Sequence, residues 1–451
     1  MSSSGSLRRV LSRRDLILYG LVLLGPTAPY PVYGIVQQLS LGHAALAYLV
    51  AMGGVLFTAA SYGKMSGAFP ASGSTYTYTR LALSEHAGFL AGWSMILDYL
   101  LIPLVSIIYA ALTAHRLAPG IPYALWAVLF TVALTALNIP GIRMTTRASE
   151  VMMVIMGVFA VLFIALCIRY VAYRHGIAGL FQMEALLRPE TFALRPLMLG
   201  AGVAALSYIG FDAISTLAED TVNPQKDIGF ATVFVCVLQT AICFFTVYLA
   251  TLVWPDYQHY PETETVILDI GRRIGGPLLF GGLTFVLLVA ALASALTGQA
   301  GASRLLYGMG RDGVLSKRIF AHINPRFSTP TRSIYLLGSV SLIAAIFLRF
   351  QIAVELLNFG AFAGFIMVNL SVIRHFYFRL RQRSGMDMLT NLVFPALGTL
   401  ACVYLWLSLS NRAKLAGFAW LAIGALYLAV ITRGFRIAPK ALAALRDVES
   451  A

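Results

Sequence analysis

Charged residues are scarce in this sequence of 451 amino acids. Asp, Glu, Lys and Arg together make up 12% of the chain, about half the share that soluble globular domains carry. Hydrophobic residues make up 59%, and apolar runs of about 20 residues recur along nearly the whole length, each long enough to cross a bilayer as a helix. This composition excludes an ordinary soluble domain and predicts an all-α polytopic protein of the lipid bilayer.

Cysteine and histidine are too few and too scattered to suggest a metal or redox centre. All four cysteines fall in predicted spans, where they are expected to pack as small apolar side chains. The seven histidines fall at helix ends or in loops, and no convincing nucleophile–base arrangement, zinc motif or phosphate-binding glycine loop is present. We therefore expect no metal, no cofactor and no enzymatic activity.

Acidic residues are the scarcer of the charged residues, 19 against 33 Lys and Arg. The basic residues lie at helix ends and in short loops, and most fall on one side of a twelve-helix arrangement with both termini in the cytoplasm. The positive-inside rule accounts for this asymmetry. The basicity therefore indicates orientation in the membrane rather than binding to nucleic acid.

The apolar runs predict twelve transmembrane helices. They cover roughly residues 15–38, 44–67, 86–114, 122–139, 150–173, 196–220, 228–253, 275–305, 333–349, 352–373, 388–409 and 414–433. The predicted parts are an N-terminal tail 1–14, a first repeat 15–173, a second, inverted repeat 195–373, two further helices within 388–433, and a C-terminal tail 434–451.

Helices 1 and 6 of this arrangement are predicted to be discontinuous. Helix 1 contains three prolines within Gly25–Pro31, which remove backbone donors and clash with the preceding turn. In helix 6 a glycine and an acid, Gly210 and Asp212, interrupt an apolar run. The breaks lie five helices apart, and matching breaks in two inverted halves are typical of a transporter binding site. The alternative is that the prolines only kink helix 1 and that Gly210 only permits close packing.

Two acids, Asp98 and Asp212, lie deep in apolar stretches that contain no Lys or Arg. An ionised acid at mid-bilayer costs roughly 2.5–3.5 kcal/mol and is usually paired with something positive. A cation from solution, either a substrate or a proton, is therefore expected to meet them. The alternatives are that local donors satisfy Asp98 and that Asp212 only caps the half-helix that follows it.

Several residues beside the breaks and the acids are candidate site residues. Tyrosine rings stabilise ammonium groups by cation–π contact, which favours a cavity lined by Tyr30, Tyr99 and Tyr208. Ser207 and Gly210 belong to the same substrate-site prediction because they lie in the helix 6 break. Two acids end helix 6 and are assigned to a gate or to proton coupling: Glu219 and Asp220.

Several stretches together resemble a known family. They are Ser61-Tyr62-Gly63-Lys64, Phe69–Tyr78, Gly92–Tyr99, Gly210–Ser215, Arg304–Val314 and Leu357–Ala361. On these stretches the chain resembles the amino acid–polyamine–organocation superfamily over nearly its whole length, and most closely its bacterial putrescine-importer branch. The resemblance implies a five-plus-five inverted repeat with two extra helices, and proton-coupled uptake by alternating access.

The resemblance also bears on the substrate. Relatives that carry α-amino acids commonly have a Gly-Ser-Gly-like stretch in helix 1, whose free amides hold the carboxylate. Here that stretch is Gly25-Pro26-Thr27-Ala28-Pro29, which offers fewer amides. Some proton-coupled relatives place a Lys in helix 5, whereas helix 5 here has no basic residue before Arg169. The proton carrier is therefore unassigned, with Asp98, Asp212 and Glu219 as candidates.

The resulting hypothesis is a secondary transporter that imports putrescine or a similar small diamine, by proton symport and alternating access. One alternative keeps the fold but makes the protein an amino acid permease, or an exchanger of amines or amino acids. Another is a membrane channel or sensor, against which the short loops and the lack of a regulatory domain argue.

Overall fold

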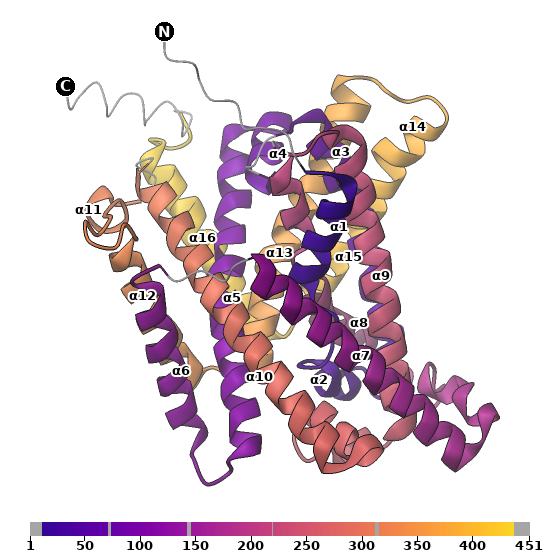
Figure 1. The fold of residues 1–451 in the computed structure, drawn as a ribbon. Helices are drawn as coiled ribbons and strands as arrows, with labels where there is room; N and C mark the ends of the chain where they lie inside the picture. The colour runs from indigo at the N-terminus through magenta and orange to yellow at the C-terminus, as the bar shows by residue number, and fades with distance from the viewer. Residues whose placement is uncertain (1–10, 71–73, 142–145, 219, 312–314, 437–451) are drawn as a thin grey trace.

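Helices make up nearly all the regular structure of this protein, which is known from a computed structural model that describes residues 11–70, 74–141, 146–218, 220–311 and 315–436. Within these ranges the extended pairing is limited to one isolated bridge between Leu11 and Thr221. Figure 1 shows that α1 begins and α16 ends at the same end of the helical bundle.

The α-helices of four or more residues are α1 (Arg13–Leu24), α2 (Tyr33–Leu39), α3 (Ala44–Ala68), α4 (Ser74–Ala82), α5 (Glu85–Leu117), α6 (Tyr123–Asn138), α7 (Thr146–His175), α8 (Leu194–Ala204), α9 (Pro224–Val253), α10 (Val266–Arg311), α11 (Lys317–Phe320), α12 (Thr331–Phe347), α13 (Phe350–Val372), α15 (Phe394–Ser408) and α16 (Asn411–Ile431). The remaining helical elements are η1 (Ile177–Leu180), η2 (Met183–Ala185), η3 (Ala205–Tyr208), η4 (Phe211–Leu217), η5 (Tyr257–His259), η6 (Ile373–Arg379), α14 (Met386–Met388) and η7 (Leu389–Val393).

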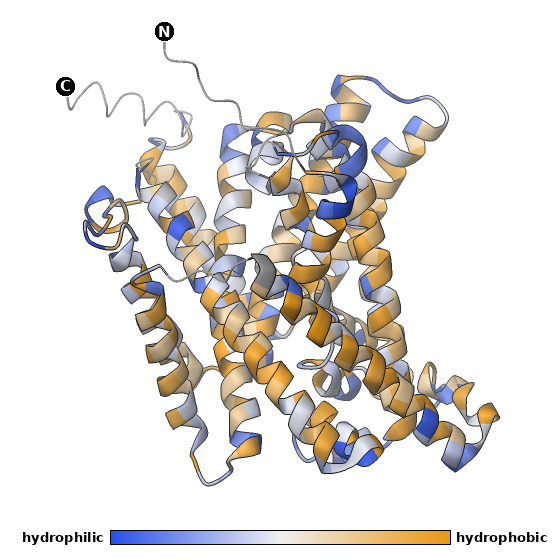
Figure 2. Ribbon diagram, viewed as in Figure 1, coloured by the Kyte–Doolittle hydropathy of each residue, from blue (hydrophilic) through white to orange (hydrophobic). Residues whose placement is uncertain are grey.

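The long helices have the dimensions of membrane spans. Nine helices within the described residues are long and apolar enough to cross a bilayer, and Tyr123–Asn138 and Thr331–Phe347 are shorter apolar helices. Figure 2 shows apolar residues along the middle of the bundle and hydrophilic residues gathered toward its ends. Large apolar side chains such as Val430, 77% exposed, cover outward faces, as expected where lipid is the solvent. The chain is therefore a multi-pass, all-α membrane protein, which confirms the predicted fold class.

The predicted discontinuities of helices 1 and 6 are present. Helix 1 consists of α1 and α2, and α1 stops at Gly25, whose φ of 70° is not helical. Helix 6 consists of α8 with η3, and then η4, separated at Gly210, whose φ is 116°. Only glycine adopts such positive φ values without steric cost. The chain therefore turns at both points.

Two features of the fold were not predicted from the apolar runs. The first is α4, nine residues of low hydropathy that are too short and too polar to resemble a span. The second is the start of α10, which begins at Val266 and bends at Gly276, where φ is 69°, before Pro277. The expected helix over 275–305 is thus the part of α10 that follows this bend.

The packing places the two broken helices between two groups of continuous ones. α5 packs along α10 and α13, and α3 packs along α9. α1 and η4 contact each other and α9 (Figure 1). The breaks of helices 1 and 6 therefore lie in the interior of the bundle.

Candidate functional site

Asp98 is buried in the middle of α5, with 4% of its surface exposed. α13 packs tightly against this point, because a Cβ atom on Gly360 would lie 2.7 Å from the carbonyl oxygen of Ser94 and 3.3 Å from the amide nitrogen of Asp98. The Oδ1 atom of Asp98 has no hydrogen-bond partner among the described residues. The carboxyl group therefore has capacity for another donor.

Asp212 lies in the first turn of η4, directly after the break of helix 6. It is 6% exposed, and backbone N–H groups of residues 210, 212 and 213 face its carboxyl group. Gly210 occupies the capping position, and its positive φ turns the chain so that this acid points into the protein. The backbone thus offers Asp212 partial compensation but no countercharge.

The two acids lie close enough for their charges to interact, and Tyr99 lies within electrostatic range of both. Tyr19 of α1 and Tyr62 of α3 are within such range of Asp212. The ion pairs of the described residues all lie elsewhere, so neither acid has a Lys, Arg or His partner within 4.0 Å in that part of the chain. The structure therefore groups the two acids, Asp98 and Asp212, into one buried region with Tyr99 beside them.

An aromatic cluster adjoins Asp212. The ring of Tyr62 lies 5.5 Å from that of Phe211 and 6.0 Å from that of Phe365, both edge to face, and the rings of Phe211 and Phe365 are 5.0 Å apart. The hydroxyl group of Tyr62 is held by Thr75 at 2.5 Å. Rings of this kind can stabilise an organic cation beside the acid. None of the three rings was predicted as a site residue.

Ser207 joins the two breaks to each other. Its hydroxyl group donates to the carbonyl oxygen of Ala28 at 3.3 Å and lies 3.3 Å from the hydroxyl group of Tyr48. Gln239 of α9 makes the same connection from a third helix, because its side-chain amide donates to the carbonyl oxygens of Gly25 at 3.1 Å and Ser207 at 3.2 Å. Gln239 was not predicted as a site residue, because the sequence of an apolar helix does not show which groups a single glutamine side chain will contact.

Tyr30 and Tyr208 are fully buried, and their contacts are with other helices. The ring of Tyr30 packs 5.3 Å from that of Phe163 on α7. The hydroxyl group of Tyr208 donates to the carbonyl oxygen of Tyr48 on α3 at 3.2 Å. These contacts direct both rings toward α7 and α3, whereas Tyr99 lies beside the acids.

The end of helix 6 is tied to the start of helix 1. Glu219 lies outside the described residues, but the carbonyl oxygen of Asp220 accepts from the amide of Leu11 at 2.9 Å, and the amide of Val222 donates to Leu11 at 3.0 Å. Arg13 pairs with Asp227 at 2.8 Å. The end of helix 6, which was predicted to form a gate or to couple a proton, is therefore hydrogen-bonded to the segment that precedes helix 1.

Most backbone amides at the helix 1 break are already used. The prolines at 26, 29 and 31 have none, and four further amides are hydrogen-bonded to carbonyl groups of the backbone, namely those of Gly25, Ala28, Tyr30 and Val32. Thr27 is then the one residue of 25–32 whose amide has no backbone partner within the described chain. A cluster of free amides for a carboxylate is thus absent from this described segment.

α10 has a polar, exposed face, and its opposite face is apolar and exposed, as expected for contact with lipid. Ser294, Thr297 and Gly301 are exposed at helical spacing, and Ser106 of α5 donates to Ser294 at 3.1 Å. Helix geometry places Phe285, 65% exposed, on the opposite side of α10 from Ser294. A polar exposed stripe inside a membrane helix indicates a path for water or solute.

These features define a class of protein: a multi-pass helical membrane protein with two broken helices and a buried acidic site between them, as in secondary transporters. In its fold the chain is similar to MhsT, whose structure was determined in complex with L-phenylalanine, with a TM-score of 0.60 at 17% identity, over 89% of this chain and 99% of that one.

Sequence comparisons specify the family. The family described as Amino acid permease matches residues 31–433. The chain is 32% identical over 436 residues to the low-affinity putrescine importer PlaP of Escherichia coli strain K12, covering 96% of each chain. It is 27% identical to a methylthioribose transporter of Bacillus subtilis, covering 96% of this chain and 95% of that one. The chain belongs to the amino acid permease family.

Proposed function

We propose that this protein imports putrescine or a similar small diamine across a bacterial inner membrane. The observation that carries the proposal is the presence of two buried acids within electrostatic range of each other, Asp98 and Asp212, without a basic partner among the described residues. A diamine supplies two positive charges to such a site. The similarity to an importer named for putrescine supports the same substrate class.

In this proposal each acid binds one end of the diamine. Asp212 binds one ammonium group beside Tyr62 and Phe211, and Asp98 binds the other through its unpartnered Oδ1 atom or carries the coupling proton. Tyr99 lines the space between them. Of the other candidate lining residues, Gly210 faces Asp212 through its backbone N–H, whereas Tyr30, Tyr208 and Ser207 contact other helices at the breaks.

The helix 1 break favours an amine over an amino acid. A zwitterion needs donors for its carboxylate as well as acceptors for its ammonium group. The three prolines and the four occupied amides leave Thr27 alone to donate from this segment. The carboxylate group of an amino acid would therefore face the two acids of the site rather than hydrogen-bond donors.

The arrangement of the two ends supports alternating access. At the end away from α1, the segment before α10 lies close against α2, because a Cβ atom on Gly34 would overlap the carbonyl oxygen of Thr263. At the same end Arg116 of α5 forms an ion pair with Asp269 of α10. At the other end Tyr19, 36% exposed, and Thr297 are accessible. This is the asymmetry expected of a site that opens to one side at a time, with both termini in the cytoplasm.

We propose proton symport as the mode of coupling. Where α7 passes the helix 1 break it presents Met156, 3.1 Å from the position of a Cβ atom on Gly25, so an apolar side chain meets the break at this point. The acids are therefore the groups that can take up a proton. Asp98, which has fewer partners than Asp212, is the better candidate for the protonation site.

Uptake by proteoliposomes that contain the purified full-length protein tests this function. Labelled putrescine should accumulate when the outside is more acidic than the inside, and unlabelled diamines should compete whereas neutral amino acids should not. Accumulation of a neutral or cationic amino acid without putrescine uptake would establish the amino acid permease alternative. Uptake that requires preloaded substrate would establish exchange.

A further inference from the structure

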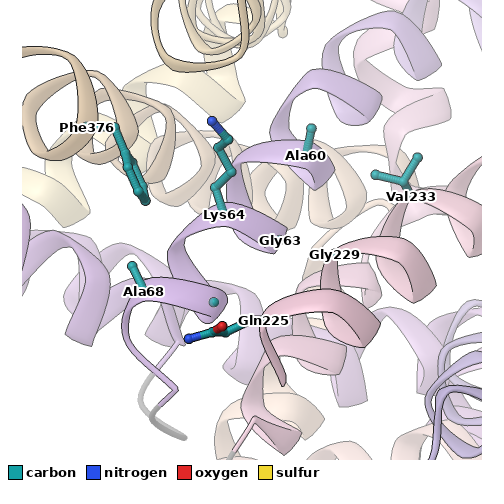
Figure 3. Close-up of a pocket in the computed structure, with 9 residues that line it drawn as sticks. Ala60, Gly63, Lys64, Ala68, Gln225, Gly229, Val233 and Phe376 are labelled. Carbon is teal, nitrogen blue, oxygen red and sulfur yellow. The ribbon is translucent and has the colours of Figure 1, made fainter. Parts of the chain in front are cut away.

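A second recess lies on the outer surface of the bundle, between α3, α9 and η6 (Figure 3). It is an open groove with a volume of about 510 Å³, and it shares no lining residue with the site around Asp98 and Asp212. The proposed transport function does not use it. Its lining is apolar except for the side chains of Lys64 and Gln225.

The apolar floor of the groove results from small residues where two helices touch. A Cβ atom on Gly63 would lie 2.5 Å from the Cα atom of Gly229, so α3 and α9 meet backbone to backbone. Ala60 and Gly67 continue this small surface along α3, and Phe376 forms one wall. The result is a channel in the outer surface that a hydrocarbon chain can occupy.

Lys64 is the one charged residue that lines the groove. Its ammonium group donates to Thr390 at 2.8 Å and to Asn391, and it lies 5.3 Å from the centre of the Phe376 ring. An ammonium group has three donors, so one is left for a ligand. The charge of Asp387 acts on Lys64, but the two make no ion pair in the described part of the chain.

Further basic residues lie next in sequence to residues that line or adjoin the groove. The side chain of Asn391, which accepts from Lys64, donates to the carbonyl oxygen of Gln382 at 3.1 Å. Exposed arginines flank Gln382 on both sides, and exposed Lys226 follows the lining residue Gln225. Lys64 lines the groove, and three exposed basic residues lie next in sequence to Gln225 or Gln382: Lys226, Arg381 and Arg383.

We propose that this groove binds an anionic phospholipid. The acyl chain lies along the small residues of α3 and α9, and the phosphate accepts from the free donor of Lys64. The groove faces outward from a membrane protein, and its apolar floor ends at the ammonium group of Lys64. That combination matches a lipid with a negative headgroup, and basic pockets between transmembrane helices recognise such headgroups.

Lipid titration of the full-length protein in detergent tests the proposal. The probes are a short-chain phosphatidylglycerol, a phosphatidylcholine with the same chains, and inorganic phosphate, with thermal stability and native mass spectrometry as readouts. The wild type should bind the phosphatidylglycerol about fivefold more tightly than the phosphatidylcholine, which corresponds to ~1 kcal/mol for one Lys near the membrane surface. Lys64→Gln should lose this preference, and Lys64→Arg should keep it. Lys317→Gln, outside the groove, is the matched control and should behave as wild type.

A substitution that keeps the charge tests the acyl-chain site separately. Ala60→Leu fills part of the apolar floor, so it should weaken binding of both lipids severalfold while the folded protein keeps Lys64. This variant decides the question if Lys64→Gln fails to fold. Three results overturn the proposal: an unchanged preference in Lys64→Gln, unchanged lipid binding in Ala60→Leu, or stabilisation by inorganic phosphate equal to that by the phosphatidylglycerol.

Discussion

The side-chain amide of Gln239 donates to the carbonyl oxygen of Gly25 at 3.1 Å, at the point where helix 1 breaks. The same amide donates to the carbonyl oxygen of Ser207 at 3.2 Å, directly before the break of helix 6. A broken helix frees carbonyl groups that cannot be left unsatisfied in a membrane interior. One buried residue of α9 therefore stabilises both discontinuities that shape the site.

Gln239→Met should destabilise the protein because it leaves the carbonyl oxygen of Ser207 without this donor and that of Gly25 with the amide of Ala28 alone. A buried group left unsatisfied costs about 1–3 kcal/mol, so the thermal midpoint should fall clearly and putrescine uptake should fall with it. Thr232→Val is the matched control, since Thr232 is buried in the same helix but donates only within it, to Ile228. Equal midpoints for the two variants would contradict this role of Gln239.

Gly210→Ala should impair folding through backbone strain rather than through a clash. The φ of Gly210 is 116°, yet the nearest atom to an added Cβ would be 3.5 Å away. Non-glycine residues pay roughly 1–2 kcal/mol in left-handed backbone conformations, and the displaced η4 should also reduce uptake. Gly53→Ala is the control, because nothing lies within 4 Å of its Cβ position in α3 and its φ is ordinary. A Gly210→Ala protein as stable and active as Gly53→Ala would show that the break needs no glycine.

Trp93→Phe should loosen the attachment of α16 to α5. The indole N–H groups of Trp93 and Trp420 each donate to the other's backbone carbonyl group, at 2.9 and 3.0 Å, and their rings stack at 4.7 Å. Trp420 lies inside α16, so its carbonyl group keeps its helical bond, and losing the indole donor costs about 0.5–1.5 kcal/mol. Trp126→Phe is the control, since the buried N–H group of Trp126 has no partner in the described structure. In thermal unfolding only Trp93→Phe should lower the midpoint.

Exchanging the charges of Arg13 and Asp227 tests the fastening of helix 1 to α9. Either Arg13→Asp or Asp227→Arg alone places like charges at the 2.8 Å contact, which should loosen the start of α1 and lower the maximal uptake rate severalfold. The double variant should recover most of the rate, because the pair is restored in reverse. The pair is partly exposed, so stability should change little. Double-variant uptake no better than either single variant would exclude a role for this pair.

The sequence predicted those features that depend on local chemistry. Three prolines and Gly210 predict the breaks. An acid within an apolar run predicts a candidate site from the sequence alone, without knowledge of the residues that surround it in space. The partners of these residues could not be predicted, because Gln239, Tyr62 and Phe365 reach the site only through helix packing.

The direction in which each side chain points could not be predicted from the sequence either. Tyr30 and Tyr99 both lie beside predicted site positions, yet the first packs on Phe163 and the second lies near the acids. The boundaries of the two inverted repeats, the count of twelve spans and the orientation of the termini stay predictions. α4 was missed because its pattern is that of a short polar helix, not of a span.

Equilibrium binding of putrescine to the purified protein tests the central claim most directly. Removing one partner of a buried charge pair costs about 2–5 kcal/mol, so Asp212→Asn should weaken binding at least about thirtyfold. Asp256→Asn, at an exposed acid that contacts His259, should bind as the wild type does. Wild-type affinity for putrescine in Asp212→Asn would contradict the claim that this acid holds the amine.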